Sequence, residues 1–368
     1  MRKGWEYKKL GEVCCPKSKI QRATKCFGGS DEILYIDISS IDNSVQEVNS
    51  ITSFTMSNAP SRAQQKVEYG DIIVSTVRPN LKNVAFIKQH DSNLVVSSGF
   101  CVLRTTDDIE RNYLFRYITS DIFTQHLMKL TTGANYPAVR DLDVRDSTIH
   151  LPPKSTQLAI VSELDKINEL IRLKKEQLKD FDNLAQSLFD EMFGDPVENE
   201  KGWEVKKLGE VYKMKSGDSL STKSFEEGDI PVYGGNGISG YHNKYNKDGS
   251  YIIIGRVGVY CGNVRIVKGR FWLTDNAFEL LYDNSSQNEV FVCSLLTHLN
   301  LRQYANAAAQ PVISNNTLKH VSIPLPPLPL QHLFAHRIDQ IEHQKAEVQK
   351  AITDLETLLA SRMQYWFE

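Results

Sequence analysis

Two stretches of the chain carry apolar residues at alternating intervals of three and four positions. In the first stretch Lys174 is the polar exception, and the apolar members are Leu164, Ile167, Ile171, Leu178, Phe181, Ala185, Leu188 and Met192. In the second Lys345 and Arg362 are the exceptions, and the apolar members are Ile338, Ile341, Val348, Ile352, Leu355, Leu359 and Trp366. A period of 3.5 over this length predicts two long helices that meet along a coiled-coil seam. Two amphipathic helices packed on globular domains are the alternative.

Proline and glycine mark the ends of these helices. Prolines at 152–153 precede the first helix, and prolines at 326–327 and Pro329 precede the second, because the residue before a proline is disfavoured in helical geometry. Gly194, with a proline two residues later, ends the first helix. The chain order is domain, helix, domain, helix. A pseudo-twofold relation between the two copies therefore predicts an antiparallel helix pair with a globular domain at each end and the termini close together.

Outside the helices, short apolar runs between Gly, Asn and Pro predict strands. They lie at residues 32–38, 70–77, 83–88 and 100–104, and again at 229–233, 250–255, 263–267 and 277–282. Residues 111–130 and 289–304 predict one helix each. The fold class is α/β (α+β), with two globular domains of mixed sheet and helix. The expected order is a first domain at 1–150, a central helix at 151–194, a second domain at 195–324 and a C-terminal helix at 325–368.

An internal repeat relates the two copies. Residues 4–13 (GWEYKKLGEV) return at 202–211 (GWEVKKLGEV) with nine identities in ten and an offset of 198. Residues 151–157 (LPPKSTQ) match 325–331 (LPPLPLQ) with an offset of 174. The segments between the matched blocks of the two copies therefore differ in length by 24 residues. GDIIVSTVR and GSYIIIGR are similar within those middles. This match predicts that Arg78 and Arg256 occupy corresponding positions, each just beyond a buried strand.

Composition excludes several classes of protein. Of 368 residues, 41% are hydrophobic, which is enough to build cores and excludes wholesale disorder. No run reaches 18 apolar residues, and no apolar segment follows the charged start, so we expect a soluble, cytoplasmic chain with no membrane partner. Six cysteines without CxxC spacing predict reduced thiols and no metal site. Lys and Arg total 43 against 45 for Asp and Glu, and this balance alone does not indicate a nucleic-acid partner.

The sequence contains no motif that indicates an enzyme. Gly235, Gly237 and Gly240 match the dinucleotide fingerprint GxGxxG, but turn residues follow where that fold requires a helix, so these glycines predict tight turns or close approach to a polymer ligand. There is no P-loop, HExxH or GxSxG motif, and no (Asp/Asn)-Pro-Pro-aromatic motif of the amino-methyltransferases, since both Pro-Pro pairs follow a leucine. We expect no catalytic residue.

Basic and amide side chains nevertheless gather in the domains. Residues 151–194 hold 6 basic and 8 acidic residues, so the helix is acidic while the basic residues bunch near each GWE block. Arg and Lys suit guanine edges and phosphates, and Asn and Gln suit adenine. Taken singly, each loop that carries these types is better explained by solvation, and only their recurrence in both copies favours recognition. The candidate DNA-contacting residues are Lys8, Lys9, Arg78, Asn80, Lys82, Asn135, Tyr136, Arg140, Lys206, Lys207, Asn236, Asn243, Lys244, Tyr245, Arg256, Gln310, Asn315, Asn316 and Lys319.

Taken together, these features resemble the specificity subunit of type I restriction-modification systems. The resemblance rests on the two GWE blocks, the two LPP-x-x-x-Q helix entrances, and the series IPVYGGNGISGY, YIIIGRVG and AAAQPVISNNTLKH in the second copy, and it covers essentially the whole chain. The first copy departs from it, since it lacks the GGNGISG series and has NYPAVRDLDV where the second has AQPVISNNTL. Its contact residues are therefore less secure, and a different half-site is implied.

The resemblance implies a non-catalytic subunit in which each domain reads one half of a bipartite double-stranded DNA site. The helices would set the spacing and dock two methyltransferase subunits, and restriction subunits would join them. S-adenosylmethionine would belong to the methyltransferase, and ATP with magnesium to the restriction subunit, so this chain needs no cofactor. From Leu164 to Met192 a helix spans roughly 43 Å at about 1.5 Å per residue. Along B-DNA that length covers on the order of a dozen base pairs.

Two other classes of protein remain open from the residues alone. One is a stand-alone sequence-specific DNA binder such as a repressor, which would bind DNA tightly without partners. The other is a coiled-coil scaffold, which would show no salt-dependent DNA binding. The near-zero net charge predicts that the isolated chain has modest affinity for DNA and binds tightly only with partner subunits. If Arg256 reads a base, Arg256→Ala weakens the second half-site only, by about 1–3 kcal/mol.

Overall fold

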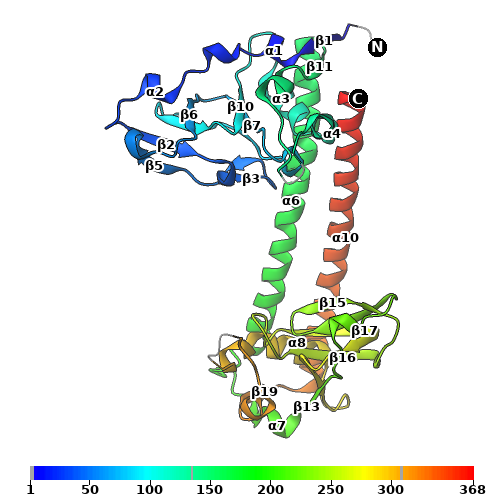
Figure 1. The fold of residues 1–368 in the computed structure, drawn as a ribbon. Helices are drawn as coiled ribbons and strands as arrows, with labels where there is room; N and C mark the ends of the chain where they lie inside the picture. Colours follow the sequence, from blue (N-terminus) through cyan, green and yellow to red (C-terminus); the bar gives the residue numbers. More distant parts are fainter. Residues whose placement is uncertain (1–3, 134–135, 307–309) are drawn as a thin grey trace. The chain divides into compact units, whose positions relative to one another are not determined.

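The computed structural model describes residues 4–133, 136–306 and 310–368, and the chain divides into two compact units (Figure 1). The first unit comprises residues 1–174 together with 351–368, and the second comprises residues 175–350. Each unit contains a mixed domain of helices and strands and one half of each of two long helices. The predicted mixed fold class is confirmed.

The two long helices are α6 (Lys154–Phe193) and α10 (Leu328–Phe367), each of 40 residues. Both bounds of α10 lie 174 residues after those of α6, so the repeat that the sequence shows holds at both helix ends. Gly194 has φ +76° and ends α6 as predicted. Pro329, in contrast, lies inside α10 rather than before it. A proline is tolerated there because the first turn of a helix has N–H groups without intrahelical acceptors.

The heptad seam is confirmed by burial. All eighteen seam positions of α6 and α10 are buried or half-buried, the polar exceptions included. In the second unit Lys345 forms an ion pair with Asp182 at 2.8 Å, and Phe334 packs edge-on against Phe189 and Phe193. In the first unit Arg362 pairs with Glu163. The end of one helix therefore meets the start of the other, and the pair is antiparallel within each unit (Figure 1).

The ion pair between Glu163 and Arg362 makes the first unit sensitive to acid. Hydrogen bonds from Arg362 and from the indole of Trp366, which lies 3.1 Å away, lower the pKa of the Glu163 carboxyl. A carboxyl whose folded pKa is depressed stabilises the fold fully above its ordinary pKa of 4.5, and this stabilisation is lost as the pH falls through the folded value. We expect Glu163→Gln to lower the unfolding temperature at pH 7 and to have a smaller effect near pH 3.

Thermal unfolding of both proteins across this pH range measures the effect. Glu191→Gln, which changes an exposed glutamate on the same helix, controls for the loss of one charge. A difference between wild type and Glu163→Gln that stays constant from pH 7 to pH 3 would contradict the assignment.

The two largest sheets of the first unit share a core. One has the order β10–β7–β8, and the other has the order β5–β2–β9–β6 with β2 and β9 parallel. Ile36, Ile73, Val96 and Val102 are buried in the core that joins them. The strand bounds are β2 Glu32–Ile36, β3 Ile41–Asp42, β4 Glu47–Val48, β5 Thr52–Thr55, β6 Ala63–Lys66, β7 Ile72–Ser75, β8 Val84–Phe86, β9 Leu94–Ser97 and β10 Phe100–Leu103.

Short helices cover this domain and pack it on α6. Their bounds are α1 Leu10–Val13, α2 Ala23–Cys26, α3 Arg111–Ile118, α4 Asp121–Leu130 and α5 Asp141–Arg145, with 3-10 turns at Lys17–Lys19, Ile38–Ser40, Met56–Asn58 and Pro79–Leu81. The single helix predicted over 111–130 is wrong. The hydroxyl of Ser120 accepts a hydrogen bond from the backbone N–H of Phe123, which caps a new helix and divides the segment. Tyr113 and Tyr117 from α3 join Leu164 and Phe367 in one core.

The largest sheet of the second unit has the order β13–β18–β16–β17–β14–β15. Its strands are β13 Lys213–Ser216, β14 Ile230–Gly234, β15 Gly237–His242, β16 Lys247–Gly255, β17 Val264–Leu273 and β18 Ala277–Leu281. Its short helices are α7 Leu208–Val211, α8 Glu289–His298 and α9 Asn315–Leu318, with 3-10 turns at Thr222–Ser224 and Leu301–Tyr304. The helix predicted over 289–304 is wrong beyond His298. Asn300 adopts a left-handed conformation with φ +44°, which ends the α-helix and begins the 3-10 turn.

The repeated end blocks of each copy pair with each other. Strand β1 (Glu6–Lys9) runs antiparallel to β11 (Thr148–Leu151), and β12 (Glu204–Lys207) runs antiparallel to β19 (Ser322–Leu325). The buried amides of Gln157 and Gln331 each donate to a proline carbonyl at 2.8 Å and accept from the backbone that starts α3 or α8. The residues shared by the copies therefore form the junction between each domain and its long helix. In the first unit Trp5 stacks on Trp366, so the two ends of the chain lie side by side, as predicted.

Two further findings concern the class of protein. No helix in the described residues is long and apolar enough to cross a membrane. All six cysteines are free, and burial raises the pKa of the Cys14 thiol to about 12, which keeps it protonated and unreactive at neutral pH.

Candidate nucleic-acid interface

In the first unit the loop between β7 and β8 collects several of the candidate residues. This loop, residues 75–83, is called the first tip loop here. It forms a bridge with a distant segment through Val77 and Ala138, and the backbone N–H of Arg78 donates to Pro137 at 2.7 Å. These bonds place Tyr136 beside Arg78, with the guanidinium 4.6 Å from the ring centroid. Two segments that are about 60 residues apart in the sequence thus present one surface.

The side chains at this tip are exposed and stand on a strained backbone. Arg78 and Asn80 are exposed, and Tyr136 is 68% exposed. Arg78 and Lys82 both have left-handed φ values, +50° and +51°. Such a conformation costs a non-glycine residue about 1–2 kcal/mol, and strain of this kind concentrates at functional sites. The surface that Arg78 and Tyr136 form is therefore a candidate for recognition rather than a by-product of folding.

The second unit repeats this arrangement in residues 255–263, called the second tip loop. The backbone N–H of Gly255 donates to the carbonyl of Asn263, and the backbone N–H of Ser75 donates to the carbonyl of Asn83 in the same way, each at 2.9 Å. Val257 bridges Val312, and Gly258 donates to Pro311 at 2.9 Å. The positive φ angles recur at Gly258 and Gly262. The two tip loops are therefore equivalent, with an offset of 180 that neither of the sequence matches shows.

This equivalence corrects the predicted pairing of Arg78 with Arg256. Arg78 corresponds to Gly258, and Arg256 corresponds to Thr76, because the carbonyls of Thr76 and Arg256 accept the equivalent bonds from Val139 and Ile313. The Arg256 guanidinium lies 5.3 Å from the Phe278 ring and within 3.4–3.5 Å of the Asp275 carbonyl and the Ser216 hydroxyl. It is half-buried. Its reading of a base stays a prediction.

The two tips differ in the side chains that they present. Where the first has Arg78, Asn80 and Tyr136, the second has Gly258, Tyr260 and Gln310. Gln310 is exposed, and Tyr260 and its neighbour Val259 are 51% and 62% exposed. Sequence reasoning missed Val259 and Tyr260 because it sought charged and amide types. An exposed aromatic at a glycine-flanked loop tip is the signal that could have identified them.

The glycine-rich series of the second copy packs against its tip loop. Asn236 lies in the tight turn between β14 and β15, and is exposed. A Cβ on Gly235 would lie 2.5 Å from the carbonyl oxygen of Val257, so only glycine permits this contact. The turn therefore brings Asn236 to the second tip loop. Since strand β15, not a helix, follows, the expectation of a tight turn is confirmed at Gly235 and Gly237, whereas Gly240 lies within β15.

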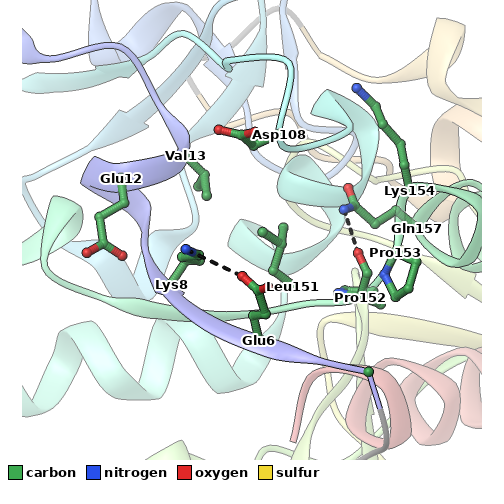
Figure 2. Close-up of a pocket in the computed structure, with 11 residues that line it drawn as sticks. Glu6, Lys8, Glu12, Val13, Asp108, Leu151, Pro152, Pro153, Lys154 and Gln157 are labelled. Atoms are coloured by element: carbon green, nitrogen blue, oxygen red, sulfur yellow. Dashed lines mark hydrogen bonds and ion pairs between the residues drawn. The ribbon is translucent and has the colours of Figure 1, made fainter.

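A second group of candidates lies elsewhere, on the paired end strands. Lys8 and Lys9 belong to β1, and Lys206 and Lys207 belong to β12. Lys319 lies near β12, because its backbone carbonyl accepts a hydrogen bond from the N–H of Gly209 at 3.1 Å. Lys8 pairs with Glu6 at 3.4 Å inside a cavity of about 360 Å³ that Glu12 and Asp108 also line (Figure 2). Lys9 pairs with Asp146 at 2.9 Å, which raises the pKa of the Lys9 amine. Lys206 pairs with Glu204 at 3.1 Å.

Three of these lysines, Lys8, Lys9 and Lys206, are already neutralised by carboxylates within the chain, whereas Lys207 donates to the hydroxyl of Ser322 and Lys319 to the side-chain oxygen of Asn316. A phosphate approaching Lys8 would meet the three carboxylates that share its cavity. The end strands are therefore weaker candidates for a DNA surface than the tip loops, although they carry the densest run of basic residues in the sequence.

The remaining candidates are scattered. Asn243, Lys244 and Tyr245 follow β15 at the end opposite Asn236, and Tyr245 stacks with Arg270. Arg140 and Lys82 are bound to Asp143 and Asp121, both at 2.6 Å. Asn315 and Asn316 begin the short helix α9, where Asn316 accepts from Lys319 at 3.1 Å. Asn135, like Arg2 and Lys3 of the N-terminal basic run, lies outside the described residues.

Comparison with known proteins shows the family of the chain. The sequence profile of the type I restriction modification DNA specificity domain matches residues 2–180 and again 200–357. The chain belongs to this family. Its two matched segments are the two copies of the repeat, so each unit carries its own specificity domain.

Relatives and solved structures of the specificity family agree with this result. The specificity subunit of the EcoprrI enzyme from Escherichia coli is 35% identical over 39% of this chain and 37% of its own length. The MjaIX specificity subunit of Methanocaldococcus jannaschii is 27% identical over 43% of this chain and 40% of its own length. The alignments thus span about two fifths of these relatives.

Structural similarity extends over the whole chain. The HsdS subunit from Thermoanaerobacter tengcongensis is 28% identical, with a TM-score of 0.52 over 100% of this chain and 97% of that one. A chain from a structural study of complex assembly and conformational transition in a type I restriction-modification system is also 28% identical. Its TM-score is 0.72 over 99% of this chain and 97% of that one. The specificity fold of two domains and two long helices is therefore shown for this protein.

Proposed function

We propose that the chain is the DNA-recognition subunit of a type I restriction-modification complex, and that each domain reads one half of a bipartite site. The observation that carries the proposal is the pair of tip loops. One backbone scaffold recurs in both units with different exposed side chains, Arg78 and Tyr136 in one and Gly258 and Gln310 in the other. Two different half-sites require the same backbone scaffold with different side chains at its tip. Contacts with base edges determine which sequence is recognised, while the scaffold only places the loop against the DNA.

The chemistry of the complex belongs to its partners. Two methyltransferase subunits would dock on the helices and bind S-adenosylmethionine, and restriction subunits would bring ATP and magnesium. This chain would hold none of these groups and would act in the cytoplasm on double-stranded DNA. Its role is to bring a chosen adenine to the methyltransferase, so we assign it no catalytic residue.

Mapping methylated adenines in a host with and without this gene tests the proposal. We expect a bipartite motif, with two read halves and an unread spacer, to be methylated only when the chain and its methyltransferase are both present. Absence of any motif that depends on the chain would overturn the proposal. Tight sequence-specific binding by the chain alone without methylation would indicate a repressor, and no salt-dependent binding would indicate a scaffold.

A further inference from the structure

A basic cavity lies at the base of the second tip loop. Its volume is about 510 Å³, and it is lined by Gly262, Asn263, Val264, Arg265, Thr297, Asn300 and Arg302. No carboxylate lines it. Neither Arg265 nor Arg302 forms an ion pair with any carboxylate in the described parts of the chain. Both arginines line the hollow; Arg302 is exposed, and Arg265 is half-buried, with its Nη1 beside Gly237.

Several backbone carbonyls near the cavity already accept hydrogen bonds from within the chain. The cavity lies near the end of α8, where exposed carbonyl groups would carry a partial negative charge. The carbonyls of Leu295 and Thr297 both accept from the N–H of Leu299, and the carbonyl of Leu299 accepts from the amide of Gln303. These acceptors are already occupied, so the two arginines remain available to an external anion.

The first unit fills the equivalent place with its own ion pair. The equivalence of the tip loops sets Lys82 against Gly262, and both have positive φ angles. The Lys82 ammonium crosses to Asp121 at 2.6 Å and is neutralised there. Gly262 has no side chain to do this, and a Cβ would lie 2.5 Å from the backbone nitrogen of Arg302. At the position of Arg265 the first unit has Ala85, which is buried. In the described residues, the equivalent place of the first unit therefore has a neutral ion pair and a buried alanine where the second unit has Gly262 and Arg265.

We infer that this cavity binds one phosphate of the DNA backbone beside the second half-site. The inference rests on the proposed function and deepens it. Two guanidinium groups match a phosphate in charge and in hydrogen-bond geometry, and asparagine amides add neutral donors. The cavity includes Asn263, at the base of the second tip loop, whose tip exposes Val259 and Tyr260. A DNA strand that contacts this tip would therefore bring one of its backbone phosphates close to the cavity. The equivalent place of the first unit, where Lys82 pairs with Asp121, would not offer this contact.

The salt dependence of DNA binding tests the inference. The full chain with its methyltransferase subunits is bound to its methylation motif over a range of salt concentrations. Loss of one phosphate contact flattens the plot of log affinity against log salt by about 0.9. We expect this change for Arg265→Gln/Arg302→Gln, with weaker binding to all sequences and an unchanged motif. Arg302→Gln alone, at an exposed position, should show part of the effect without disturbing the fold.

A matched control lies on the same strand. Arg270 and Lys268 are exposed on β17 beyond Arg265, and Arg270 is paired with Asp248. Arg270→Gln/Lys268→Gln removes the same charge but should leave the slope within about 0.3 of wild type. If both double variants flatten the salt dependence equally, the effect comes from the change in net charge alone, and the inference is overturned.

Neutralising single phosphates locates the contact. A methylphosphonate is placed in turn at each position flanking the second half-site. We expect one position to weaken the wild type and to have no effect on Arg265→Gln/Arg302→Gln. Equal losses in both proteins at every position would overturn the inference. If inorganic phosphate binds the wild type but the salt slope and the methylphosphonate profile are unchanged by the double variant, the cavity is a site for free phosphate and not for DNA. Wild-type complex that shows no sequence-dependent binding at all would instead refute the proposed function.

Discussion

Arg78→Gly is expected to relax recognition of one half of the bipartite motif while the protein stays as stable as wild type. If Arg78 makes a bidentate base contact, its loss costs about 1–3 kcal/mol, or roughly 5- to 150-fold in affinity for sites with the correct first half. Glycine relieves the left-handed strain of about 1–2 kcal/mol, which offsets its greater freedom in the unfolded state and the lost stacking on Tyr136. Methylation mapping and thermal unfolding measure the two effects separately.

Two further variants make this result specific. Tyr260→Ala, at the second tip, should relax the other half of the motif and leave the first half intact. Lys88→Ala removes an exposed cation that follows β8, at the end away from the tip loop, and that pairs with Glu47. This variant should change recognition of neither half of the motif. If Arg78→Gly weakens all sequences equally, Arg78 contacts a phosphate and not a base. If both tip variants relax the same half, the assignment of one half-site to each unit is wrong.

Lengthening both long helices by one heptad is expected to change the motif by its spacer alone. Seven residues add about 10 Å of helix, or about three base pairs of B-DNA. Insertion after Lys174 in α6 and after Val348 in α10, which are equivalent positions, keeps the apolar seam in register because the seam repeats every seven residues. The two read halves should stay the same, and the unread spacer in the methylated motif should become longer by about three base pairs.

The matched control is an insertion of four residues at the same two positions. It adds more than one helical turn but displaces the seam, so Ile352 and Leu188 would no longer align with the rest of their stripe. We expect this protein to unfold at a lower temperature and to lose methylation. A spacer that is unchanged in the heptad variant would contradict the view that helix length sets the half-site separation.

The long helices were predictable because their signals are local. Periodicity places the seam, and the proline pairs with Gly194 place the ends, since each acts on the backbone within a few residues. The two errors in the shorter helices have the same origin. Ser120 and Asn300 interrupt segments whose apolar pattern continues, because a single capping or left-handed residue can end a helix that the pattern alone would extend.

The candidate DNA surface was predicted only in part. The sequence singled out Arg78, Tyr136, Asn236 and Gln310, which the structure brings to the tip loops. It also singled out Lys8 and Lys9, which the structure pairs with Glu6 and Asp146. Residue type shows which side chains suit a base or a phosphate. It does not show which cations are already neutralised, because an ion pair such as Lys82 with Asp121 joins residues far apart in the chain.

The sequence by itself determined that two copies of one unit are joined by two equal helices, since repeats and periodicity are written in consecutive residues. Only the tertiary structure decided which loops of the two copies correspond. The tip loops are matched by backbone bonds from Arg78 to Pro137 and from Gly258 to Pro311, and segments of different length intervene on either side. Long-range hydrogen bonds of the backbone carry no residue signature. For that reason Arg78 could be aligned with the wrong arginine, and the open cavity at Gly262 could be recognised only beside the ion pair that closes its counterpart.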